Sequence, residues 1–170
     1  MAPIRTDARR HRRGAAVAVS AAFGALVALP LTAAPAGATQ TEEHCVYSAA
    51  TGDHTCYPTR AEAQSRAQDQ GSDVARASGE VIGAVVFEDE NYGGSSLTIT
   101  VPEPCPKNDK VDFWLDLGDD WKNRISSVQA WSSCWVWLYP GSGDRAGPYK
   151  DNHSTVGGHI NDRTVTVGLS

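Results

Sequence analysis

Short apolar runs separated by turn residues fill the chain from Gly79 onward. They are "VIGAVVFEDE", "SSLTITV", "VDFWLDL", "ISSVQAW", "CWVWLYP" and "RTVTVG", rich in β-branched and aromatic residues and parted by Gly, Pro, Asn and Asp. Many short strands with frequent turns predict an antiparallel sandwich or barrel. Within "CWVWLYP", strand alternation places Trp135 and Trp137 on one face and Val136 and Leu138 on the other, and we expect one of these faces to form core.

Residues 39–78 have a different pattern. "EHCVYSAATGDHTCYPTR" alternates around Gly52-Asp53, which predicts a small hairpin. Thr59 and Glu62 then form a capping box before "AEAQSRAQDQ", which predicts a short helix that ends at Gly71. The only apolar residue type in this helix is alanine, so we expect it to bury little. We interpret residues 39–78 as a hairpin, a helix and a linker, and residues 79–170 as the β-rich domain.

The first 38 residues are typical of a signal peptide. Five arginines precede an apolar run, "AAVAVSAAFGALVALPL", and Ala36-Gly37-Ala38 supplies small residues for cleavage after Ala38. The mature chain would keep ten of fifteen basic and nineteen of twenty acidic residues, for a net charge of −9. That charge argues against nucleic acid and anionic lipid as partners. No later apolar run is long enough for a membrane span. We therefore expect a secreted, extracellular protein.

All four cysteines lie in the part expected to be exported, where an even number predicts two disulfides. Of the three possible pairings we favour Cys45–Cys56, which closes the local hairpin, and Cys105–Cys134, which ties down a long connection. The alternative is a zinc site made of His44, Cys45, His54 and Cys56. These residue types suit zinc, but their spacing matches no usual zinc ribbon.

The strand-rich half contains an internal repeat. "WVWLYPGSGDRAGPYK" restates "GAVVFEDENYGGSSLT", and "HINDRTVTVGL" restates "WKNRISSVQAW". Two copies of about forty residues are too few for a solenoid. They predict a pseudo-symmetric sandwich of two Greek-key units, each of which needs the other to bury its hydrophobic face.

The repeat resembles the βγ-crystallin superfamily, in particular its secreted bacterial members. That family's hairpin has an aromatic, four residues, an aromatic, one residue and a glycine, as Phe87, Tyr92 and Gly94 do here. Its later motif is matched by residues 122–127, "KNRISS", except at Lys122. The second unit lacks the second hairpin aromatic, and Val165 stands where Ser or Thr is expected. The resemblance covers half of the chain and implies an all-β, double Greek-key β-sandwich, here preceded by the disulfide-closed hairpin and short helix.

The same resemblance implies Ca²⁺ sites built from both units. One site would combine three ligands: the Glu88 carbonyl, the Ser126 hydroxyl and the Asp162 carboxylate. Its mirror would need the Pro140 carbonyl, Asn123 and Val165, and valine has no side-chain oxygen. Calcium prefers six to eight hard oxygen ligands, so we predict at most one weak site. The alternative is that Asn123 and Asp162 only stabilise turns and that the serines hydrogen-bond backbone groups.

We therefore expect a secreted, disulfide-stabilised binding or structural protein, with Ca²⁺ and an unknown extracellular protein or cell-surface target as partners. One alternative is a proteinase inhibitor, particularly of metalloproteinases, acting through the proline-rich "VPEPCPKNDK" (residues 101–110). The other is a killer-toxin-like antagonist of competing cells. No spacing suggests a catalytic triad, so we do not expect an enzyme. We read three remaining features as turn or surface positions: "GSGDRAG" (141–147), Asp119-Asp120, and the pair His153 and His159.

Overall fold

The computed structural model describes residues 41–69, 79–108 and 110–170. The predicted signal peptide, its cleavage site after Ala38 and the predicted helix end at Gly71 lie outside these residues. Within the described part, no helix combines the length and the apolarity needed to cross a membrane.

Within the described residues, nine strands form two sheets. The first sheet has the order β2-β1-β4-β3-β6, with β1 (His44–Ser48), β2 (His54–Tyr57), β3 (Val81–Phe87), β4 (Ser96–Val101) and β6 (Ser127–Ala130). Its strands are antiparallel except for the parallel pair β1 and β4. The second sheet has the order β5-β9-β7-β8 and is antiparallel, with β5 (Phe113–Asp116), β7 (Val136–Pro140), β8 (Ala146–Tyr149) and β9 (Thr164–Leu169).

Each repeat contributes one segment to the sheet of the other. In the first repeat, β3, β4 and β6 lie in the first sheet, while β5 pairs with β9 of the second repeat. In the second repeat, β7, β8 and β9 lie in the second sheet, while His153 forms an isolated bridge with Val128 of β6. Each repeat is thus a Greek key whose third segment lies against the partner sheet. This topology confirms the predicted all-β double Greek-key sandwich.

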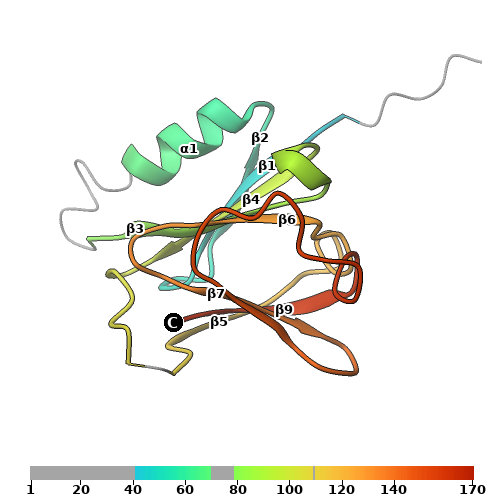
Figure 1. Cartoon of the computed structure of the whole chain (residues 1–170). Coiled ribbons are helices and arrows are strands. Elements are labelled where there is room, and N and C mark those ends of the chain that lie inside the picture. Colours follow the sequence, from blue (N-terminus) through green and yellow to red (C-terminus); the bar gives the residue numbers. More distant parts are fainter. Residues whose placement is uncertain (1–40, 70–78, 109) are drawn as a thin grey trace, which may run out of the picture. The chain divides into compact units, whose positions relative to one another are not determined.

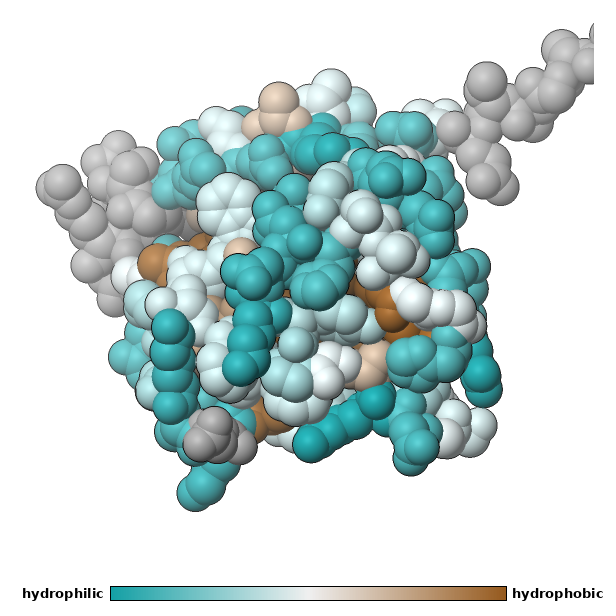
Figure 2. All heavy atoms as spheres, in the orientation of Figure 1, coloured by the Kyte–Doolittle hydropathy of each residue, from teal (hydrophilic) through white to brown (hydrophobic). Residues whose placement is uncertain are grey.

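The main core lies between the sheets. Strand alternation points one face of every strand into it, and the buried side chains include Val86, Leu97, Ile99, Val128, Val136, Leu138, Val167 and Leu169. The predicted faces of β7 are confirmed, because Val136 and Leu138 are fully buried while Trp135 and Trp137 are half-buried. Figure 2 shows the consequence for the face in view, which is mostly hydrophilic with small, separate hydrophobic areas.

Helix α1 (Arg60–Asp69) begins at the predicted cap. The Thr59 hydroxyl accepts a hydrogen bond from the Glu62 backbone N–H at 3.2 Å, which satisfies one of the free donors of the first turn. The buried residues Ala63 and Ala67 lie one turn apart and face the first sheet. Small side chains let the helix approach the strands closely, so an alanine face that looked too small to bury much still docks.

A second, smaller core forms where α1 covers the outer face of the first sheet. It consists of Ala63 and Ala67 from the helix together with Val46, Ile82, Val85 and Phe87 from the strands. Figure 1 shows α1 on one side of β1, β3 and β4, with β5, β7 and β9 on the other. Strand β3 is therefore buried on both faces, which explains its continuous apolar run.

Both favoured disulfides are present. Cys45–Cys56 joins β1 to β2, and Cys105–Cys134 joins the segment after β4 to the residue before β7. Parallel pairing of β1 with β4 integrates the N-terminal hairpin into the first sheet, and residues 39–170 cluster as one compact unit. The division at residue 78 therefore does not separate two bodies of contacts, and as a domain boundary it stays a prediction.

A buried polar row lies beneath the helix, on the outer face of β1 and β4. His44 Nδ1 and Ser96 Oγ are 2.9 Å apart. Glu80 accepts hydrogen bonds from Thr100 Oγ1 at 2.6 Å and from Ser48 Oγ at 2.8 Å. Burial lowers the pKa of His44, the positive charge of Arg60 lowers it further, and Glu42 partly opposes this. The folded protein therefore favours neutral His44.

This arrangement predicts acid sensitivity. The pKa of His44 lies below its ordinary 6.5 in the folded state, so its contribution to stability is complete above that value. The contribution is lost as the pH falls from 6.5 through the folded-state pKa. We expect His44→Gln to flatten the dependence of Tm on pH between about pH 8 and about pH 5. The exposed His159→Gln is the control, and parallel curves for the wild type and His44→Gln would contradict the prediction.

Candidate metal centre

Two equivalent loops, one from each repeat, meet through reciprocal backbone hydrogen bonds. Asn123 N–H donates to the Thr164 carbonyl at 2.8 Å, and Asp162 N–H donates to the Ile125 carbonyl at 3.2 Å. Asn123 and Asp162 both adopt the left-handed conformation, with φ of 58° and 54°, which Asn and Asp tolerate better than most residues. The left-handed backbone conformation by itself therefore explains why the repeated motif has Asn or Asp at this position.

A second pair of bonds repeats the same symmetry. Leu117 N–H donates to the Val165 carbonyl, and Val156 N–H donates to the Ser126 carbonyl, both at 2.9 Å. Each bond joins a residue of one repeat to the motif of the other. The paired loops therefore hold Ser126 next to Asp162, although 36 positions separate them in the sequence.

Ser126 and Asp162 are two of the four predicted ligand residues, and they are in contact. Ser126 Oγ donates to Asp162 Oδ1 at 3.3 Å, while Asn161 Nδ2 donates to Asp162 Oδ2 at 2.7 Å. Ser126 N–H donates to the Phe87 carbonyl at 2.9 Å, so the third ligand residue, Glu88, follows in the chain directly after this contact. A hydroxyl and a carboxylate are both oxygen ligands of the kind that calcium prefers.

The Glu88 side chain has another partner. Its Oε1 lies 2.7 Å from Arg124 Nη2 and accepts a bond from Arg124 Nε at 3.2 Å, and its Oε2 accepts one from Ser95 N–H at 3.3 Å. Burial would raise the pKa of Glu88, but the bonds from Arg124 and Ser95 outweigh it and hold the pKa below 4.5. The carboxylate is thus ionised and matched by Arg124, which leaves the backbone carbonyl as the group that Glu88 could offer to a metal.

Asn123, the fourth predicted ligand residue, belongs to the mirror position. There Val165 takes the place of Ser126 and lies near the second hairpin, with its Cγ1 3.7 Å from where a Cβ on Gly141 would be. Pro140 precedes that glycine. The structure thus places the mirror residues at equivalent positions, but Val165 presents a methyl group where the first centre has a hydroxyl.

The acidic hairpin between β3 and β4 is held mainly by Ser127. The Ser127 hydroxyl donates to the Asp89 carbonyl at 2.6 Å and accepts from Tyr92 N–H at 3.0 Å. Tyr92 packs edge-on against Phe87, with ring centroids 5.5 Å apart. A Cβ at Gly94 would lie 2.8 Å from Asp89 Oδ2, so this position requires glycine. These contacts account for the aromatic and glycine positions of the hairpin motif.

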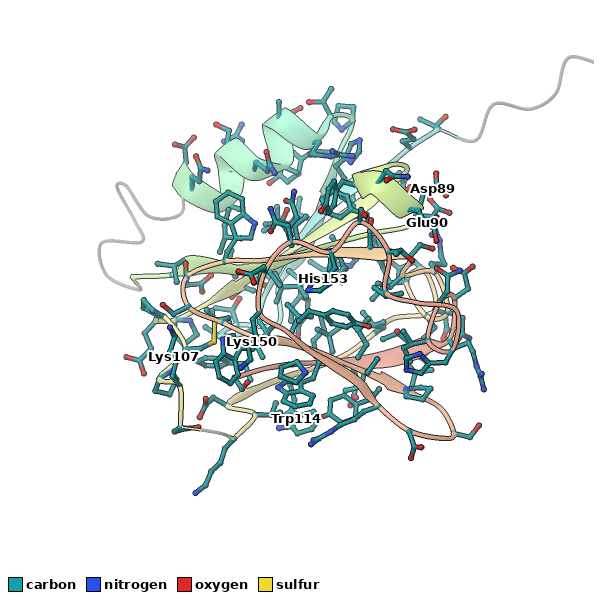
Figure 3. The ribbon with its side chains drawn as sticks, viewed as in Figure 1. Asp89, Glu90, Lys107, Trp114, Lys150 and His153 are labelled. Carbon is teal, nitrogen blue, oxygen red and sulfur yellow. A yellow bond between two sulfur atoms is a disulfide. The ribbon has the colours of Figure 1, made fainter. Side chains whose placement is uncertain are left out.

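The hairpin carboxylates face outward. Asp89 and Glu90 project from the hairpin, far from the face that carries Trp114 and Lys150 (Figure 3). Glu90 accepts a hydrogen bond from Thr155 Oγ1 at 2.9 Å, which ties the hairpin to the second repeat. The sequence motifs did not indicate this role of Thr155 or the pairing of Arg124 with Glu88, although Arg recurs after Asn/Asp in both repeats as Arg124 and Arg163.

The cysteine-histidine group is a possible metal-binding group of different chemistry. Potential ligand atoms of Cys45, His54 and Cys56 lie within 4.8 Å of one another. The two sulfurs are joined in a disulfide, however, and metals bind thiolates. His44, the fourth residue of the zinc hypothesis, points to Ser96 instead. In the disulfide form this group therefore stabilises the hairpin.

The other features set aside in the sequence take ordinary positions. Residues 141–145 form the turn between β7 and β8. His153 packs its ring against Tyr149 at 4.9 Å, and His159 is exposed. The hydrogen bond and charge of Lys122, at 2.9 Å, lower the pKa of Asp119, so Asp119 is a paired surface carboxylate.

The contacts of Ser127 predict a large effect of one hydroxyl. Ser127→Ala leaves the Tyr92 N–H and the Asp89 carbonyl without their partner. We expect unfolding free energy to fall by about 1–3 kcal/mol, as for other buried polar groups that lose a hydrogen bond. Urea unfolding measures this, with the exposed Ser142→Ala as the matched control. Equal stability of the two variants would show that the hairpin does not depend on this hydroxyl.

Comparison with known proteins gives matches at the level of structure. No family model and no curated protein matches the chain. A βγ-crystallin domain from Clostridium beijerinckii matches 51% of this chain and 95% of its own length, with 21% identity and a TM-score of 0.39. A double mutant of that domain matches 52% of this chain and 97% of its own length, with 22% identity and a TM-score of 0.41. A βγ-crystallin from an archaeon matches 53% of this chain and 99% of its own length, with 18% identity and a TM-score of 0.38.

The matched proteins are βγ-crystallins, the family that the sequence motifs resemble. The fold is assigned from the strand topology and the motif residues of this chain. The first hairpin has the aromatic and glycine positions of that family, packed against one another. Each Greek key places its third segment against the sheet of the other. By its topology and motif residues, this chain has the double Greek-key fold that its resemblance to the βγ-crystallins predicted.

Proposed function

We propose that this chain is a secreted, disulfide-stabilised βγ-crystallin-like binding protein that holds one Ca²⁺ weakly. The metal would bind where the two repeats meet, through Ser126, Asp162 and the Glu88 carbonyl. The contact of 3.3 Å between Ser126 Oγ and Asp162 Oδ1 supports this most directly, because it joins two oxygen ligands from different repeats. Export rests on the expected signal peptide, and the two disulfides suit an oxidising compartment.

Nearby charge explains why the affinity should be low. Arg124 lies two positions before the ligand residue Ser126, and its Nη2 forms an ion pair with Glu88 Oε1 at 2.7 Å. A guanidinium close to the centre opposes a divalent cation, and Asp162 is the only carboxylate among the three proposed ligands. Extracellular calcium modules often bind in the range of about 10⁻⁴–10⁻³ M. We expect this range here.

A bound ion would stabilise the fold because the centre exists only when both repeats are folded. We expect about 10 mM Ca²⁺ to raise Tm by a few degrees relative to EDTA. Asp162→Asn should reduce the shift, since it removes the charge while retaining a residue type that tolerates a φ of 54°. Differential scanning calorimetry measures the shift, and isothermal titration measures the affinity.

Two further variants sharpen this test. The exposed Asp144→Asn removes the same charge elsewhere and should leave the shift unchanged. Val165→Ser restores the hydroxyl of the mirror position and should add a second, weaker binding event. An equal concentration of Mg²⁺ controls for ionic strength. If Tm does not move with Ca²⁺, or if Asp162→Asn and Asp144→Asn behave alike, this centre does not bind calcium.

Proteinase inhibition is the second function that a specific feature favours. Pro104 and Pro106 are exposed on either side of Cys105, which is buried in its disulfide with Cys134. Prolines and a disulfide reduce the entropy lost when a loop binds. Lys107 has a φ of 47°, so the backbone there is not the extended strand that adds to a proteinase's sheet. Inhibition would therefore use the proline segment rather than a substrate-like insertion at Lys107.

A panel of secreted metalloproteinases and serine proteinases tests this alternative. If the segment inhibits, stoichiometric protein should block one class. Double substitution of Pro104 and Pro106 by Gly should then weaken the block by about tenfold, because the loop loses its rigidity. The calcium response of that variant is the control for folding. Turnover that is unaffected across the panel removes this function.

A further inference from the structure

The outer face of the second sheet carries an aromatic cluster that neither the fold nor the calcium centre requires. Trp137 and Tyr139 point outward from β7, and Trp135 precedes them on the same face. Trp114 reaches this face from β5 and is 54% exposed. Helix α1 packs against the other sheet, so no helix covers these rings in the described part of the chain. A protein that needed them only for its core would bury them.

Gly168 organises the cluster. It lies in β9 directly between Trp114 on one neighbouring strand and Trp137 on the other. A Cβ there would lie 2.9 Å from Val111 Cγ1 and 3.1 Å from Tyr139 Cε2. The missing side chain thus makes room for Val111 and for the Tyr139 ring, which packs against Trp114 with ring centroids 5.0 Å apart. The face is packed from several strands and has a defined shape.

Two cations lie on these rings. The Arg145 guanidinium is 4.2 Å from the Trp137 ring centroid and donates to the Tyr139 hydroxyl at 3.2 Å. Lys150 Nζ is 3.9 Å from the Trp135 ring centroid. Among the described residues, neither cation has a carboxylate within 4.0 Å, whereas Lys122 and Arg124 do. The chain has an excess of acidic residues, yet Arg145 and Lys150 are held on indole rings without a carboxylate partner. Their positive charges are therefore available to an anionic ligand.

A hollow of about 260 Å³ lies beside them. Its lining combines the indoles, one cation and small neighbours: Val111, Trp135, Trp137, Arg145, Pro148 and Ser170. Trp137 Nε1 donates to Ser170 Oγ at 2.9 Å, which fixes the indole as a wall of the hollow. Arg145 is exposed and keeps several N–H donors beyond its bond to Tyr139.

We propose that this hollow binds a six-membered ring that bears a carboxylate. The apolar part of the lining, made of Val111, Pro148 and the two indoles, favours the apolar face of such a ring. The guanidinium fork of Arg145 matches a carboxylate in two parallel hydrogen bonds, and Lys150 adds a second positive charge. The net negative charge of the protein disfavours densely charged polymers, so an isolated carboxylate is the matching ligand. Uronic-acid units of a polysaccharide and free aromatic acids both present this chemistry.

Titration followed by tryptophan fluorescence and calorimetry tests the proposal on the whole exported chain. The probes are glucuronic acid and benzoic acid, each paired with a neutral analogue, glucose and benzyl alcohol. We expect at least one acid to bind about tenfold more tightly than its analogue, the difference that one charge-assisted pair commonly supplies. The acid that binds identifies the source of the ring.

Matched variants separate the site from general effects. Arg145→Gln should reduce acid binding to the level of the neutral analogue, and Trp137→Ala should abolish it. Arg163→Gln and Trp131→Ala remove the same residue types elsewhere on the surface and should change nothing. Binding should persist in EDTA, because the hollow uses no residue of the calcium centre. Failure of this proposal is therefore distinguishable from failure of calcium binding.

Each of the following results would overturn the proposal. The first is that neither acid binds, or that acid and neutral analogue bind equally. The second is that Arg145→Gln and Arg163→Gln have the same effect. The third is that the face is occupied by a second copy of the chain, detected as a dimer by sedimentation that Trp137→Ala dissociates. A glutamate-rich peptide that competes more strongly than the ring acids would instead assign the face to a protein partner.

Discussion

The exchange of backbone hydrogen bonds between the two repeats is the constraint on which the rest of this structure depends. Neither repeat completes its own sheet, because β5 of the first repeat pairs with β9 and His153 of the second repeat bridges to β6. The bonds from Asn123 to Thr164 and from Asp162 to Ile125 make the same exchange in the loops. Buried polar backbone groups must be paired, so one repeat cannot fold to this geometry without the other.

The proposed calcium centre is a consequence of this exchange. Asp162 must adopt a left-handed backbone to make its reciprocal bond, and in doing so it approaches Ser126 of the other repeat. The position would hold an Asn or Asp for its backbone even without a metal. Arg124 has two opposing effects, because its ion pair holds the Glu88 side chain in place while its positive charge disfavours a nearby cation. The structural roles and the proposed metal-binding roles thus fall on the same few residues.

The two outer faces of the sandwich differ in what covers them. Helix α1 covers the first sheet through Ala63 and Ala67, and it closes over a buried polar row that includes His44 and Glu80. The second sheet carries half-buried indoles with cations on them. One outer face is therefore used to integrate the N-terminal hairpin and helix, and the other is available for recognition.

By itself, the sequence determined the local features of this protein. Strand alternation predicted the faces of β7, Thr59 predicted the start of α1, and the repeated motif predicted two Greek keys, because each of these depends on neighbouring positions. Only the tertiary structure decided that β1 pairs with β4 and that an alanine face suffices to dock α1. It also decided that Arg124 forms an ion pair with the Glu88 carboxylate. The sequence did not indicate the role of Gly168 either, since the contacts that require glycine come from Val111 and from the Tyr139 ring. Such contacts join residues far apart in the chain, and no local pattern records which of them will meet.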